Sequence, residues 1–95
     1  MSWLNLGEVA SLIERRHGRE HAADVVQQLR AALLLDDVTA ERVLGAARIK
    51  AAHPIAFADC FAAATAAAHR ATLLTGDPEL LERKVGCRTR DLRKR

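Results

Sequence analysis

The sequence predicts an α/β fold in which helices connect the strands of a short parallel sheet. An apolar strand over residues 71–75 follows an alanine-rich helix over 57–69 and stops at Gly76-Asp77-Pro78. Stretches with helical spacing fill most of the remaining chain. Helices that alternate with short apolar strands imply parallel strands joined by helical crossovers. Acids that follow such strands lie at the carboxyl edge of the sheet, where parallel sheets bind ligands.

Composition agrees with one small globular domain. The chain has 95 residues, 49% of them hydrophobic, and only three are aromatic. A chain of this length forms a single domain with a thin stability margin. The apolar weight lies in alanine and leucine, which favours closely packed helices over an aromatic-rich β-sandwich. The sequence has no signal peptide and no membrane span of about 20 apolar residues, so we expect a cytoplasmic protein with reduced thiols.

Two helices and a short strand are expected in the first part of the chain. Apolar residues at helical spacing predict a helix over 4–16, which Ser2 or Asn5 could cap and Gly18 ends. A second helix is predicted over 19–33. The apolar run at 33–38 is expected to turn into a short strand.

Two more helices precede the strand at 72–75. Thr39 is a favourable N-cap for a helix over 40–52. The inner face of this helix is predicted at positions 43, 44, 47 and 51, and His53-Pro54 ends it. The next helix, over 57–69, is expected to bury a stripe at positions 57, 61, 64 and 68. After the strand, Asp77 could cap a short helix with Pro78 at its first position, and 87–92 is a possible last strand.

Three acids have apolar or tightly turned surroundings: Glu8, Asp59 and Asp77, with Glu79 close to the last. Mg²⁺ takes oxygen ligands and keeps several waters, so a few convergent carboxylates can bind it. Each acid also has a structural interpretation: Asp77 as an N-cap, and the other two as charges near the start of a helix. Caps and dipole partners are the more common uses of such residues, so the spacing alone favours the structural interpretation over a metal site.

Other reactive side chains lack the partners that catalysis or metal binding requires. His17 and His21 have a spacing that can bind zinc on a helix, but Gly18 between them favours exposed histidines at a helix boundary. Cys60 and Cys87 fit no metal or redox spacing. Ser11, Thr65 and Cys60 have no visible base partner.

Charge is distributed unevenly along the chain. Residues 83–95 contain seven Lys or Arg and one acid, whereas residues 1–82 contain eight basic and eleven acidic residues. A basic tail on an acidic body could steer a polyanion toward the body. It could equally be a solvated terminus that keeps the protein in solution.

Three stretches of the sequence resemble a known family. They are NLGEV at 5–9, IKAAHPIAFADCFAAA at 49–64 and LLTGDPEL at 73–80. In content and spacing they resemble the PIN domain, with VapC-type ribonuclease toxins of bacterial toxin–antitoxin pairs as the nearest group. The resemblance covers positions 2 to about 82, and the second and third stretches are specific in combination.

The resemblance implies a three-layer α/β/α fold and an endoribonuclease that depends on Mg²⁺ or Mn²⁺. It implies that Glu8, Asp59 and Asp77 hold the cation, with Glu79 a less certain participant. PIN domains open with a central strand that ends in an aspartate. We therefore expect this chain to lack that strand, its aspartate and the helices that follow it.

The sequence thus predicts a partial PIN-like domain at 1–82 and a basic segment at 83–95. The resemblance implies RNA as the substrate, a VapB-like antitoxin as the partner, a homodimer and no membrane. The alternative is a catalytically impaired PIN fragment that binds an antitoxin or a second copy. A third reading is a nucleic-acid-binding module that uses the basic segment.

Overall fold

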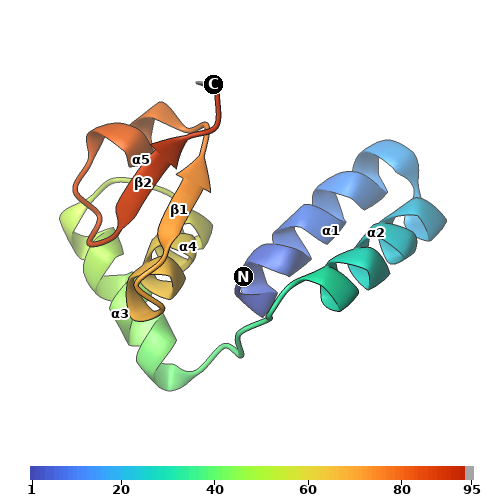
Figure 1. Cartoon of the computed structure of the whole chain (residues 1–95), viewed down its shortest axis with the longest axis horizontal. Helices are drawn as coiled ribbons and strands as arrows, with labels where there is room; N and C mark the ends of the chain where they lie inside the picture. The colour runs from blue at the N-terminus through green and yellow to red at the C-terminus, as the bar shows by residue number, and fades with distance from the viewer. Residues whose placement is uncertain (94–95) are drawn as a thin grey trace. The chain divides into compact units, whose positions relative to one another are not determined.

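The computed structural model describes residues 1–93 and divides the chain into two compact units, Met1–Val38 and Thr39–Arg95. Figure 1 labels their helices and strands. In the described residues, the first unit contains α1 (Trp3–His17) and α2 (Arg19–Ala32), and the second contains α3 (Ala40–Ala52), α4 (Phe57–Ala68), β1 (Thr72–Thr75), α5 (Pro78–Glu82) and β2 (Arg88–Asp91). The predicted α/β class with a short parallel sheet is confirmed.

The first unit is a pair of packed helices separated by one glycine. The Ser2 hydroxyl caps α1 by accepting a hydrogen bond from the Leu4 amide at 3.2 Å. Gly18 adopts a φ of 90°, a conformation that favours glycine, and so ends α1 immediately before α2 begins. Leu6 of α1 and Ala22 of α2 are buried, and the Arg30 guanidinium lies 5.4 Å from the centroid of the Trp3 ring.

The strand expected within 33–38 does not form. Asp36 makes a single parallel bridge with Ser2, through backbone hydrogen bonds from Trp3 to Asp36 and from Asp36 to Met1. The extended segment before α1 is too short to pair with more residues, because Trp3 already belongs to the helix. Leu34, in the same run, is 93% exposed.

Helix α3 begins directly after Thr39, as predicted. The Thr39 hydroxyl caps it by accepting a hydrogen bond from the Arg42 amide at 3.1 Å. Its predicted inner face is wrong: Ala46 is fully buried, whereas Leu44 is 61% exposed. A Cβ placed on Gly45 would lie 3.9 Å from the Ala64 Cβ of α4. Small residues therefore lie where α3 faces α4, and Ala46 is buried in preference to the larger Leu44.

Helix α4 forms most of the core of the second unit. Six of the seven residues from Cys60 to Ala66 are buried. Of the predicted stripe, Phe61 and Ala64 are buried, but Phe57 and Ala68 are exposed because they are the terminal residues of the helix. The Phe57 and Phe61 rings remain in contact, with centroids 5.8 Å apart.

The two strands are parallel and are connected through α5. Thr72 pairs with Arg88 and Thr75 with Asp91, so the strands end at the same edge. Helix α4 packs against β1, and α5 packs against β2. Because β2 pairs with β1, the basic segment contributes a strand to the second unit, while the predicted division at residue 82 stays a prediction.

No single helix within 1–93 is long and apolar enough to cross a membrane. Helices α3 and α4 satisfy the length and composition criteria only together, and the chain bends by 119° between them.

Candidate functional site

Asp77 follows β1 and starts α5. Its Oδ1 accepts a hydrogen bond from the Glu79 amide at 2.9 Å, and its own amide donates to the Thr75 hydroxyl at 3.0 Å. The N-cap interpretation of Asp77 is therefore correct as local structure. It does not exclude a ligand role, because the cap uses one carboxylate oxygen and the residue is only half-buried. The cap and Pro78 hold the carboxylate in a defined position just beyond the strand.

Asp59 lies in the first turn of α4 and is half-buried. The N-cap of this helix, Ala56, makes no side-chain capping hydrogen bond, so Asp59 is the acid that complements the positive end of the α4 dipole. The chain turns back after α4 to form β1, and Figure 1 shows the start of α4 and the end of β1 toward the same end of this unit. Asp59 and Asp77 therefore belong to one end of the second unit.

Glu8 belongs to the first unit, where it lies on α1 and is exposed. No acid occupies the first turn of that helix. Asp59 and Asp77 belong to the second unit, so the convergence of Glu8 with them stays a prediction. Among residues 1–93, no group of three His, Cys, Asp or Glu side chains is assembled for a metal ion.

A further pair of charged residues lies where the two strands end. Asp91, the last residue of β2, is aligned with Thr75 of β1. Arg93 donates from Nε to Asp91 Oδ1 at 3.0 Å and from Nη2 to Oδ2 at 3.1 Å. The hydrogen bonds and the negative charge of Asp91 raise the pKa of the Arg93 guanidinium. The charge of Asp77 raises it further, but by less. The carboxyl edge therefore contains a held arginine beside Asp77.

Sequence reasoning missed this pair, because Asp91 was treated as one charge in a basic tail. The signal available was an acid at the end of the possible last strand. Parallel strands bring such an acid to the same edge as an acid that follows another strand.

A family model for the PIN domain matches residues 1–85. The chain belongs to the PIN domain family. The family agrees with the mixed α/β architecture observed, and PIN domains are generally nucleases that use divalent metal ions. Searches of curated proteins and of solved structures found no significant match.

The donor chemistry of this PIN domain fits a hard cation. Carboxylate oxygens are the ligands that Mg²⁺ and Mn²⁺ prefer, and Asp59 and Asp77 supply them from one end of a unit. Full burial would make two acids costly to ionise, but both are half-buried and keep access to water. Waters could therefore complete the coordination of a bound ion.

Nucleophilic catalysis by a side chain has little support in this PIN domain. The Thr65 hydroxyl is buried and donates to the Phe61 carbonyl at 2.8 Å, and the Ser11 hydroxyl donates to the Glu8 carbonyl at 2.8 Å. Burial is the main cause that raises the pKa of the Cys60 thiol, opposed by Lys50 and supported by Asp59. A raised pKa leaves less of the reactive thiolate at neutral pH.

The histidines His17 and His21 are exposed on either side of Gly18, as expected for a helix boundary. Their ring centroids are 5.3 Å apart. Within residues 1–93, no third His, Cys, Asp or Glu joins them in a group that could hold a metal ion.

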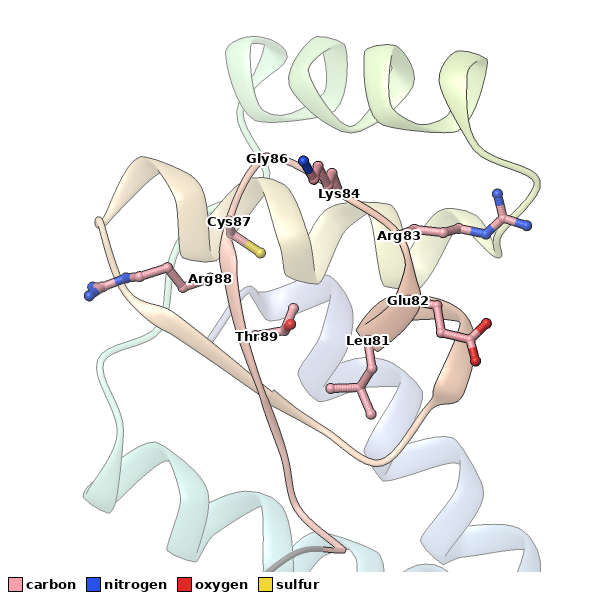
Figure 2. A pocket seen from close by; sticks show the side chains of 8 residues that line it. All are labelled: Leu81, Glu82, Arg83, Lys84, Gly86, Cys87, Arg88 and Thr89. Carbon is pink, nitrogen blue, oxygen red and sulfur yellow. The ribbon is translucent and has the colours of Figure 1, made fainter.

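An open hollow in the second unit is lined by neither Asp59 nor Asp77. It has a volume of about 660 Å³ and is lined by residues of α5, the following loop and the start of β2. Figure 2 shows Arg83 and Arg88 extending from it in opposite directions, and Arg88 donates a hydrogen bond to the Arg70 carbonyl at 2.9 Å. The hollow adjoins the amino end of β2, whereas Asp77 and Asp91 follow the carboxyl ends, so it is not the predicted metal site.

Proposed function

We propose that this chain is a metal-dependent endoribonuclease of the VapC type. The observation that carries the proposal is the PIN family match together with two half-buried carboxylates, Asp59 and Asp77, at one end of the second unit. Glu8 is proposed as the third carboxylate, from the motif at 5–9. The substrate is RNA, and localisation in the cytoplasm stays a prediction.

In this proposal, Glu8, Asp59 and Asp77 hold one Mg²⁺ or Mn²⁺. When bound, the cation supplies the positive charge that favours deprotonation of an attacking water and stabilises the oxygens of the phosphodiester. Asp77 contributes a carboxylate that the cap to Glu79 orients, so little conformational freedom is lost when a cation binds. Asp59 contributes a carboxylate from the first turn of α4, where the positive end of the helix dipole favours a negative charge. The side chain of Glu79 is exposed in the same turn and could reach a water or the substrate.

Removal of the cation is the first test. We expect single-stranded RNA to be cleaved by the full chain with millimolar Mn²⁺ or Mg²⁺, and the rate to fall to background in EDTA, because three carboxylates without a cation repel a phosphodiester. Re-addition of Mn²⁺ should restore the rate, whereas Ca²⁺, which prefers more ligands and looser geometry, should restore less. Cleavage that persists in EDTA would refute the proposed chemistry.

A second candidate is a PIN-derived module that only associates, with a VapB-like antitoxin or with a second copy. Large apolar side chains on the second unit are exposed, with Leu74 at 56% and Leu92 at 61%. Each described strand pairs on one side only, and unpaired strand edges favour association.

Light scattering coupled to size-exclusion chromatography tests association directly. We expect a homodimer at micromolar concentration, and Leu74→Lys should shift it toward monomer because a charge at an apolar interface is costly to bury. Leu34→Lys in the first unit is the control, since Leu34 is also exposed. A monomer that cleaves RNA with Mn²⁺ would exclude the associating module.

A further inference from the structure

We infer that Arg93, held in place by Asp91, binds a phosphate of the RNA at the carboxyl edge of the sheet, and that Asp91 is a positioning residue for it. The inference rests on the proposed function and adds the residue that would orient the polyanion. It concerns only the second unit, in which β1, β2 and Arg93 lie together.

The backbone places Arg93 beside the end of β1. Beyond β2, the Leu92 amide still donates to the Thr75 carbonyl at 3.0 Å, so the two chains stay adjacent past the aligned pair of Thr75 and Asp91. The stem of Arg93 then crosses Gly76, where an added Cβ would lie 3.7 Å from the Arg93 Cγ. The next residue after Gly76 is Asp77, so the guanidinium and a proposed metal ligand share this edge.

The ion pair leaves the guanidinium able to bind a second anion. An arginine has five N–H donors in a rigid planar fork. Asp91 receives one from Nε and one from Nη2, and a further hydrogen bond from the Arg93 amide at 2.8 Å. The other three N–H groups make no hydrogen bond within residues 1–93, and 58% of the Arg93 side chain is exposed, compared with 14% for Asp91. The carboxylate is thus the shielded support and the guanidinium the accessible group.

This arrangement suits a phosphate better than a free surface arginine does. A flexible arginine loses side-chain entropy when it binds an anion, whereas a fork already held by a carboxylate loses less. The edge also contains the acids Asp77 and Asp91, which repel a polyanion on their own. The positive charge of Arg93, which Asp91 holds at this edge, offsets that repulsion where the phosphodiester must approach.

Two other arginines of the second unit lack these features. The Arg88 fork is turned toward the Arg70 carbonyl at the amino end of β2. Arg90 is exposed on the open face of β2, paired across the sheet with Leu74. Arg90 is therefore a matched control: it has the same charge and lies three residues away, but it is not at the strand ends.

The test is RNA binding by the full chain, measured by fluorescence anisotropy in EDTA at several salt concentrations, with Asp59→Asn as the common background. We expect Arg93→Ala to weaken binding about tenfold, in line with the loss of charge-assisted hydrogen bonds. We expect its salt slope to fall by about 0.7, the value for one phosphate contact on a single strand. Arg90→Ala should weaken binding less than about threefold, as expected for a solvated charge. Arg93→Lys should recover only part of the affinity, since lysine cannot form the fork.

Asp91→Asn tests the positioning role. It keeps the shape of the side chain but weakens the hold on Arg93, so binding should fall while the salt slope stays near that of the Asp59→Asn chain with Asp91 intact. Equal effects of Arg93→Ala and Arg90→Ala would overturn the inference, as would tighter binding or faster cleavage by Arg93→Ala, which would mean that the guanidinium blocks the edge. Absence of RNA binding by the unmodified chain would overturn it too.

The proposed function is judged separately, by cleavage with Mn²⁺ in the chain that retains Asp59. A chain that cleaves RNA but shows no difference between the two arginine variants refutes only the role of Arg93. A chain that binds RNA through Arg93 but never cleaves it refutes only the nuclease proposal.

Discussion

Replacement of Asp59 by asparagine is expected to lower Mn²⁺-dependent RNA cleavage by about a hundredfold or more, the scale on which loss of one electrostatic group acts on such reactions. Asparagine keeps the size of the side chain but removes the charge that a divalent cation requires. The expected loss is therefore chemical. Fold damage should be small, because Asp59 is only half-buried and lies in the first turn of α4.

Cleavage of a fluorescent RNA under single-turnover conditions measures this effect, and two controls separate its causes. Asp24→Asn makes the same substitution at an exposed position of α2 and should leave the rate unchanged. Glu41→Gln removes the first-turn acid of α3, so it reproduces the loss of a helix-dipole partner without touching the site. If Asp59→Asn cleaves RNA as fast as these controls do, Asp59 is not a metal ligand.

The second large effect is on stability. Phe61→Ala should reduce the free energy of unfolding by about 3–5 kcal/mol, through lost burial and the cavity left behind. Phe61 is fully buried in α4, and it is among the largest fully buried side chains of the described residues. A domain of this size has a total stability of about 5–15 kcal/mol. The variant should therefore lose a large share of its stability and unfold at a clearly lower urea concentration than the unmodified chain.

Phe57→Ala is the matched control, because it removes the same side chain from the same helix at a position that is 41% exposed. It should lower stability by about 1 kcal/mol, the scale of one lost aromatic contact with Phe61. Urea unfolding followed by circular dichroism compares the two variants. Equal midpoints for Phe61→Ala and Phe57→Ala would contradict the burial pattern of α4.

The local elements of this chain could be predicted from short-range chemistry. Thr39 caps α3 and Asp77 caps α5 with Pro78 at its first position, as their residue types indicate. The strand at 72–75 and the last strand within 87–92 are also confirmed. Such signals depend on a few neighbouring residues, and these suffice because a cap or a turn satisfies its hydrogen bonds locally. The carboxylates Asp59 and Asp77 could be proposed for the same reason.

Interactions between distant segments decided the rest. Hydrophobic periodicity predicts Leu44 on the inner face of α3, but Ala46 is buried instead, next to Gly45 where the helix faces Ala64 of α4. The run at 33–38 remains a single bridge because only the residues before α1 pair with it.

At the carboxyl edge of the sheet, some features also follow from the sequence and others only from contacts between distant segments. The sequence by itself determined that an acid follows β1. It also contains the family motifs that carry Glu8, Asp59 and Asp77. Only the tertiary structure decided that Asp91 is aligned with Thr75 and that Arg93 crosses Gly76 to meet it. Strand register depends on backbone pairing between segments far apart in the chain, and local propensity does not encode it.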